Sequence, residues 1–142
     1  MPKTRVVLLT IKNSTGYRMT EPTPTFKSGR LADGWEFPTT IEPGTVEKVE
    51  MYEKDNTWAG CSGYVTYIMN NGYVTIAFSN PSVGKNKLGC GITGEDVWDN
   101  MSDHKYKPFS ASFTINGEKF IANMLCTGGD VNKADITLSL KT

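Results

Sequence analysis

The side chains best suited to chemistry in this sequence are one histidine and three cysteines. His104 could act as a base that activates Cys90 or Cys126, because an imidazole can take the proton from a neighbouring thiol. Such a site also needs a third group that orients the imidazole, and neither cysteine lies in a recognisable motif. An exposed loop histidine is the simpler interpretation. We therefore predict that the protein is not an enzyme and has no catalytic residues.

The carboxylates Glu95, Asp96, Asp99 and Asp103 form the second group that could do chemistry, as a metal site or as an acid–base set. A calcium loop would need oxygen ligands at tighter alternating spacing. If a helix begins at Gly94, the positive end of its dipole accounts for Glu95 and Asp96, and Asp99 and Asp103 share a solvated face. We expect no bound metal and no cofactor.

Length and charge narrow the range of partners. The chain has 142 residues, the size of one domain, so we predict a single domain over residues 1–142. Its 15 basic residues balance 15 acidic ones, which leaves no excess positive charge to attract nucleic acid. No apolar run approaches the roughly 20 residues that a membrane-spanning helix needs.

The first apolar run and the cysteines bear on localisation. Val6–Leu9 is too short for the apolar region of a signal peptide, so we interpret it as part of the first strand. The three cysteines are odd in number and widely spaced, which fits reduced thiols better than a disulfide framework. We expect a cytoplasmic protein, or one released without a signal peptide.

Strand-like runs separated by turn residues make up most of the chain. Cys61–Met69 and Tyr73–Phe78 flank residues 70–72, where an Asn-Gly step supplies the positive φ angles of a tight hairpin. Pro81 cannot donate to a strand ladder, so the second run is expected to stop near Ser79.

Other turn signals extend the same pattern. A second hairpin is expected between Phe109–Ile115 and Lys119–Cys126, and Ala134–Leu140 alternates strictly, as a last strand does. Pro22 and Pro24 remove two backbone donors, so residues 20–25 are expected to form an irregular edge rather than a central strand.

One helix candidate interrupts the strands. Thr93 could cap a short helix near residues 94–103, with Val97, Trp98 and Met101 as its apolar stripe. Because each half-apolar strand must bury one face against a second layer, we predict a mainly β fold, a two-sheet β-sandwich of about ten strands with this one short helix.

Short segments in a distinctive order carry a family resemblance. They are Ile11-x-Asn13-x-x-Gly16, Phe26-Lys27-Ser28-Gly29, Gly63–Met69 and Phe78-Ser79-x-Pro81. With the order of strands, turns and helix from Val7 to Leu140, they resemble the actinoporin-like family, β-sandwich proteins whose best-known members bind choline-headed lipids and perforate membranes.

The resemblance implies a site. The family residues that match Ser28, Ser79 and Pro81 help to form a phosphocholine pocket, and an aromatic residue at the position of Trp98 contributes to its wall. Hydroxyl groups can satisfy a phosphate, and an aromatic face attracts a quaternary ammonium. On this basis we expect a non-enzymatic protein that binds membrane lipid headgroups.

Two departures from the family argue against pore formation. Family members that insert into lipid carry a cluster of Trp and Tyr just after the Ser-x-Pro motif, where this chain has Ser82–Gly89 without an aromatic residue. The family also needs a segment on the order of 20 residues ahead of the first strand to span the membrane, and only residues 1–4 precede it here. We therefore expect binding without perforation.

A carbohydrate-binding lectin is the alternative, because fungal fruit-body lectins resemble actinoporins in fold. Its candidate sugar platforms are Trp35, Trp58 and Trp98. Each of these tryptophans could instead be buried in the sandwich core. The expected partner is thus a lipid headgroup or a glycan, and an oligomer stays open.

Overall fold

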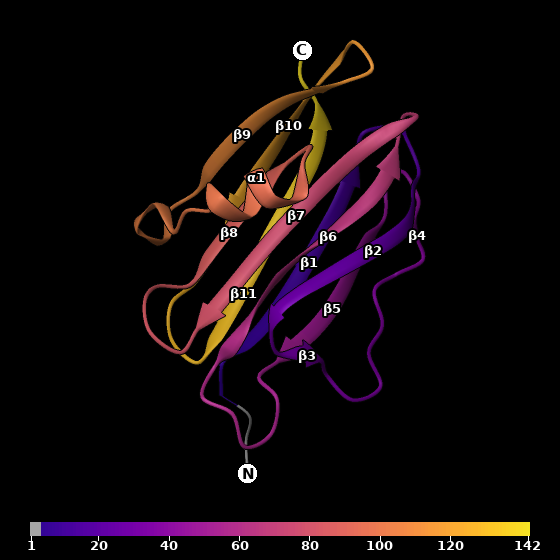
Figure 1. The fold of residues 1–142 in the computed structure, drawn as a ribbon. Coiled ribbons are helices and arrows are strands. Elements are labelled where there is room, and N and C mark those ends of the chain that lie inside the picture. The colour runs from indigo at the N-terminus through magenta and orange to yellow at the C-terminus, as the bar shows by residue number, and fades with distance from the viewer. Residues whose placement is uncertain (1–3) are drawn as a thin grey trace.

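Two β-sheets pack face to face in the computed structural model, which describes residues 4–142 (Figure 1). The six-stranded sheet has the order β3-β5-β1-β11-β10-β9 and the five-stranded sheet the order β4-β2-β6-β7-β8. This confirms the predicted mainly β, two-sheet sandwich, with eleven strands where about ten were expected. The strands are β1 (Val6–Ser14), β2 (Met19–Ser28), β3 (Arg30–Leu31), β4 (Thr40–Ile41), β5 (Val46–Tyr52), β6 (Gly60–Met69), β7 (Gly72–Pro81), β8 (Lys87–Gly91), β9 (Phe109–Ile115), β10 (Glu118–Leu125) and β11 (Val131–Leu140).

The long hairpin β6–β7 forms the middle of the five-stranded sheet, as its alternation predicts. Along β7, Val74, Ile76 and Phe78 are fully buried in the core between the sheets, so the residues between them face outward. The turn differs from the prediction in one detail. Asn70 and Asn71 hold the positive φ angles, at 52° and 57°, and Gly72 already begins β7.

Two hydrogen bonds join the tips of the two predicted hairpins. The Asn70 side chain donates to the carbonyl of Ile115 at 3.1 Å, and the Asn116 side chain donates to the carbonyl of Asn70 at 2.7 Å. An amide that bonds a neighbouring loop favours the left-handed backbone at these tips, which explains why Asn takes positions that Gly could occupy.

The segment with Pro22 and Pro24 is an irregular edge, as predicted. Although β2 lies between β4 and β6, β4 pairs only with Met19 and Thr20, so both prolines lie where the far side of β2 has no partner strand. The pairing of β2 with β6 shifts register between Thr20 and Thr23.

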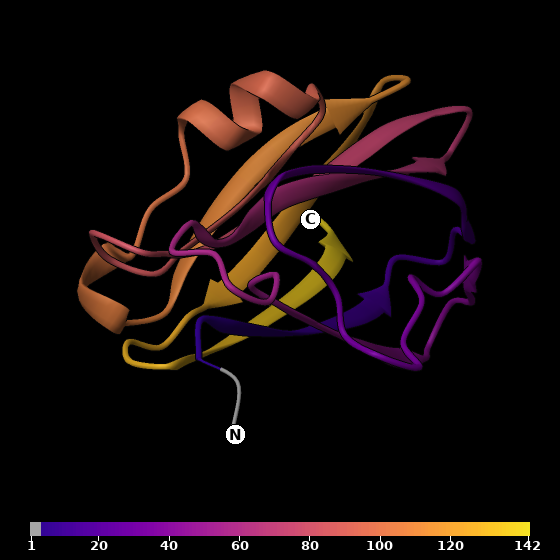
Figure 2. The same cartoon turned by 60° about the horizontal axis from the view of Figure 1, so that its bottom comes forward.

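The predicted helix is present but shorter than residues 94–103. Helix α1 (Gly94–Asp99) begins after Thr93, whose side chain makes no capping hydrogen bond, and it packs on the outer face of the five-stranded sheet against β7 and β8 (Figure 2). A separate 3₁₀ turn, η1, spans His104–Tyr106. At six residues, α1 depends on the sheet beneath it more than on its own hydrogen bonds.

Strand β7 also runs further than predicted, because Pro81 pairs with Gly60 instead of ending the ladder at Ser79. Cys61, Cys90 and Cys126 are buried free thiols, consistent with the prediction of reduced cysteines. In the described range, the helices are all too short to cross a membrane. The argument against pore formation used the short segment ahead of the first strand. Most of that segment, residues 1–3, lies outside the described residues.

Candidate functional site

A pocket opens on the outer face of the five-stranded sheet, between α1 and the loop that joins β7 to β8. Ser79, Pro81 and Trp98 all line it, so the structure brings together three residues that the resemblance indicated. Its volume is about 330 Å³. Charged groups line its walls as well: Lys85 and Lys87 on the strand side, and Asp99 on the helix side. We call this the α1 pocket.

Small residues on the sheet allow α1 to lie close to it. A Cβ added at Gly89 would lie 3.3 Å from the Val97 carbonyl, and one added at Gly91 would lie 2.9 Å from the Val97 side chain. These two glycines therefore let Val97 sink against the sheet, where it is 8% exposed. Trp98, the next residue, is left half-buried at the pocket wall.

The floor of the α1 pocket is fastened to the other sheet. Ser79 and Lys87 are register partners on β7 and β8. The buried amide of Asn132, from β11, donates to the backbone carbonyls of Ser79 at 3.0 Å and Lys87 at 3.2 Å. One side chain thus fixes the two strand segments that present a hydroxyl and an ammonium group to the pocket.

Two more buried asparagines hold the same end of the sandwich. The Asn80 amide donates to the carbonyl of Val6 at 3.0 Å and that of Asp130 at 3.0 Å, and the Asn86 amide donates to that of Thr127 at 2.8 Å. Neither asparagine is among the predicted site residues. The alternation of β7 could have identified Asn80. This residue follows Val74, Ile76 and Phe78 on the inward face of the strand, where a buried polar side chain needs a hydrogen-bond partner.

The Trp98 ring already has a cation beside it. The Lys27 ammonium lies 5.8 Å from the ring centroid and forms an ion pair with Glu95 at 2.7 Å. Tyr64 also donates to Glu95. The hydrogen bonds from Lys27 and then Tyr64 hold the pKa of Glu95 below its ordinary value, and the bond to Glu95 raises the pKa of Lys27.

Ser28 is placed next to the α1 pocket's floor rather than among the residues that line it. Its hydroxyl lies 3.0 Å from that of Ser62, and Ser62 is the register partner of Ser79. The three serines therefore form a row across β2, β6 and β7. In this row Ser28 reaches the pocket only through Ser62.

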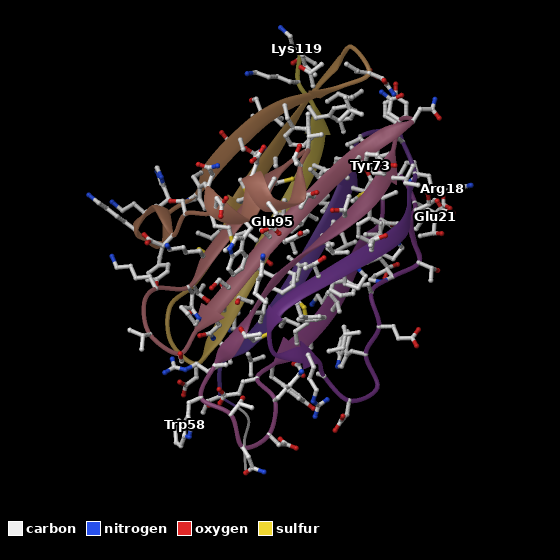
Figure 3. The ribbon with its side chains drawn as sticks, viewed as in Figure 1. Arg18, Glu21, Trp58, Tyr73, Glu95 and Lys119 are labelled. Atoms are coloured by element: carbon white, nitrogen blue, oxygen red, sulfur yellow. The ribbon has the colours of Figure 1, made fainter. Side chains whose placement is uncertain are left out.

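The three tryptophans are not core residues, and they do not gather. Trp35 is 38% exposed in the loop between β3 and β4, and Trp58 is 89% exposed in the loop between β5 and β6. Trp58 lines a second hollow together with Arg5, Ser82 and Val83. Figure 3 shows it at the lower end of the molecule, away from Tyr73 and Glu21.

Val83 joins this second hollow to the α1 pocket, because it lines both. Val83 is 88% exposed, and the Arg5 guanidinium donates to the Ser82 carbonyl at 3.1 Å, which ties the Val83 loop to the start of β1. We call Trp58 and Val83 the apolar edge. An aromatic residue beside the pocket is therefore present, but it lies in the loop between β5 and β6 and not in Ser82–Gly89.

The residues considered for catalysis occupy other surroundings. The His104 ring stacks on Phe109 with 5.4 Å between centroids. The Cys126 thiol is buried against backbone carbonyls, and burial raises its pKa to about 11; burial also raises the pKa of Cys90. Thiols held in the protonated form are weak nucleophiles. Among residues 4–142, no three His, Cys, Asp or Glu side chains gather in a way that could hold a metal ion.

No protein-family model and no curated protein matches the sequence. Solved structures do match. The lipid-binding protein Nakanori is 11% identical, with 98% of this chain and 72% of that chain covered and a TM-score of 0.75. RahU protein, solved in complex with a TRIS molecule, is 12% identical over 96% of each chain, with a TM-score of 0.58.

The lectin XCL of Xerocomus chrysenteron is 13% identical, with 94% of this chain and 97% of that chain covered and a TM-score of 0.51. At such low identities the likeness is one of fold. The chain thus has the β-sandwich fold of the lipid-binding protein Nakanori and of the lectin XCL, and this confirms the fold that the resemblance in the sequence implied.

Proposed function

We propose that the protein is a non-enzymatic membrane-recognition protein that binds a zwitterionic lipid headgroup, a phosphate joined to an ammonium group, in the α1 pocket. The observation that carries this proposal is the meeting of Ser79, Pro81 and Trp98 in one hollow whose walls have opposite charges. Nakanori, which shares the fold, is described as a lipid-binding protein, and this supports the proposal.

The two walls suit the two halves of such a headgroup. Lys85 and Lys87 are exposed ammonium groups that attract a phosphate, and the Ser79 hydroxyl can donate to its oxygens. On the opposite wall, Trp98 offers an aromatic face and Asp99 a carboxylate to the ligand's ammonium group. Ser28 acts indirectly in this scheme, by bonding the Ser62 that adjoins Ser79.

The apolar edge adds a contact with the bilayer itself. Tryptophan favours the membrane interface, where its ring is half in apolar and half in polar surroundings. Trp58 and Val83 are almost fully exposed, so a bilayer surface can cover both side chains. Because Val83 also lines the α1 pocket, a headgroup in the pocket and a bilayer against the edge are compatible.

The test is vesicle flotation with the full chain. We expect binding to vesicles of phosphatidylcholine or sphingomyelin, weaker binding to phosphatidylglycerol, which has the phosphate without the ammonium, and competition by soluble phosphocholine. Trp98→Leu and Lys87→Gln should each weaken binding about tenfold, whereas Trp35→Leu, on a loop away from the pocket, should not. Equal binding by all four proteins would refute the α1 pocket as the site.

Perforation is a separate question with its own measurement. We expect that the chain binds vesicles without releasing an enclosed dye, since the described helices are all too short to span a bilayer. Robust dye release at micromolar protein would contradict this part of the proposal.

Glycan binding through Trp35, Trp58 and Trp98 has less support as the alternative. Trp58 and Trp98 line different hollows, and Trp35 lies in a third segment. If excess soluble sugar abolished the vesicle binding that depends on Trp98, this alternative would replace the headgroup proposal.

A further inference from the structure

A third hollow, separate from the α1 pocket and from the hollow at Trp58, lies on the outer face of the five-stranded sheet, at the end opposite to the α1 pocket. It has a volume of about 370 Å³ and is lined by Glu21, Pro22, Thr23, Thr66, Ile68 and Tyr73. Figure 3 shows Tyr73 and Glu21 at the end of the sheet near the β6–β7 turn. Ser79 lies six positions after Tyr73 on β7, a distance of roughly 20 Å along a strand. We call this hollow the bulge pocket, and it is independent of the α1 pocket.

A β-bulge builds one wall of the bulge pocket. Thr20 pairs with Ile68 and Thr23 with Thr66, so Glu21 and Pro22 both stand opposite the single residue Tyr67. Glu21 has a φ of 52°, a left-handed conformation that a glutamate rarely adopts. Bulges of this kind re-aim side chains, and residues held in sparsely populated backbone conformations cluster at binding sites.

The polar groups of the bulge pocket are ready to accept hydrogen bonds. Thr75 donates its hydroxyl proton to the Ile92 carbonyl at 3.0 Å, so Thr66, 2.8 Å from Thr75, must be the donor in that pair. The Thr66 oxygen thus keeps a lone pair for a ligand. Within residues 4–142, the side chains of Glu21 and Thr23 have no hydrogen-bond or ion-pair partner.

The nearest cation in sequence does not neutralise Glu21. Arg18 forms its ion pair with Glu42 at 2.8 Å. Glu21 therefore keeps both carboxylate oxygens open, enough to accept two hydroxyl groups on adjacent carbon atoms.

The other half of the bulge pocket is apolar. Tyr73 is 59% exposed, and Ile68, its register partner on β6, lies beside it half-buried. With Pro22 they make an apolar wall next to the acceptors. A sugar ring has the matching character, because one face carries C–H groups and its edge carries hydroxyl donors.

We infer that the bulge pocket binds a saccharide, with the C–H face of a pyranose ring on Tyr73 and two neighbouring hydroxyl groups donating to Glu21. Thr66 accepts from a third hydroxyl group, and Thr23 can donate or accept. A quaternary ammonium fits less well, because such ions are held best by several aromatic rings and this hollow has one, beside an isoleucine.

The test is saturation-transfer NMR on the full chain with the methyl pyranosides of glucose, galactose, mannose and N-acetylglucosamine. We expect at least one to bind, with a dissociation constant on the order of 1 mM, because the hollow is shallow. Tyr73→Ala and Glu21→Gln should each weaken that binding about tenfold. Glu36→Gln, which removes an exposed carboxylate elsewhere, and Trp98→Leu, in the α1 pocket, are the controls and should leave it unchanged.

A third variant separates ligand binding from folding. Glycine adopts a φ of 52° without strain, so Glu21→Gly should raise the urea midpoint of unfolding while it removes saccharide binding. Saturation transfer from none of the four pyranosides, binding that survives both Tyr73→Ala and Glu21→Gln, or binding of tetramethylammonium in their place would each overturn the inference.

Discussion

The two ends of β7 present different kinds of surface on one sheet face. At Ser79 the floor is pinned from behind by Asn132, and the walls carry opposite charges. At Tyr73 the wall is a strained bulge, and the open groups are acceptors beside an aromatic ring. The first arrangement suits an ionic headgroup and the second a neutral polyol. The fold alone therefore does not determine which ligand each hollow can bind. Local features determine it: buried amides behind the α1 pocket, and one inserted residue in β2 at the bulge pocket.

The largest expected effect comes from replacing Asn132, the buried amide behind the α1 pocket. Asn132→Ala removes two side-chain hydrogen bonds to β7 and β8. It also removes a third, in which the Asn132 Oδ1 accepts from the backbone N–H of Thr127 at 3.2 Å. Leaving these buried groups unpaired should cost about 2–4 kcal/mol in the free energy of unfolding, measured by urea denaturation.

The matched control for this variant is Asn123→Ala. Asn123 is an exposed asparagine on β10 whose side chain has no hydrogen bond to the part of the chain that the structure describes, so the change should be within about 0.5 kcal/mol. At temperatures where Asn132→Ala is still folded, phosphocholine binding should weaken more than pyranoside binding. Equal stability of the two variants would show that Asn132 does not pin the pocket.

The apolar edge gives an intermediate effect. Trp58→Ser should lower vesicle affinity roughly tenfold by removing an interfacial ring, yet leave the affinity for soluble phosphocholine unchanged, because Trp58 does not line the α1 pocket. The comparison is made by flotation and by NMR titration of the same protein. A parallel loss in both measurements would mean that the edge and the pocket are one site.

The smallest expected effect is the loss of the Lys27–Glu95 ion pair at low pH. Glu95 has a lowered pKa, so its ion pair with Lys27 persists at neutral pH and is lost as the pH falls through that folded-state value. Its small contribution to stability is lost over the same range. The Trp98 indole resonance should report this step, because Lys27 lies over the ring, and Lys27→Met should remove it. An indole shift that is the same in both proteins would break the link between Glu95 and Trp98.

The sequence predicted the features that local residues encode. Alternation and turn residues located both long hairpins and the last strand, and the two prolines located the irregular edge. The helix was predicted too long because its stripe included Met101, whereas α1 ends at Asp99 with Asn100 as its C-cap. An apolar stripe predicts which residues face the sheet, but it does not predict at which residue the helical backbone hydrogen bonds end.

The missing features depend on contacts between distant segments. Asn132 acts on strands more than 40 residues away in the chain, and only the assembled sandwich shows which carbonyls it meets. Trp58 adjoins Val83 through two loops whose approach no local pattern encodes. The bulge at Glu21 requires the register of β2 against β6, which the prolines suggest only as irregularity.

The most direct test of the headgroup proposal is an NMR titration of the full chain with soluble phosphocholine. The proposal predicts shifts at the amides of Ser79 and Lys87 and at the Trp98 indole, with Tyr73 and Thr66 unchanged, and loss of these shifts in Trp98→Leu. Saturable shifts confined to Tyr73 and Thr66, or no shifts at all, would contradict it.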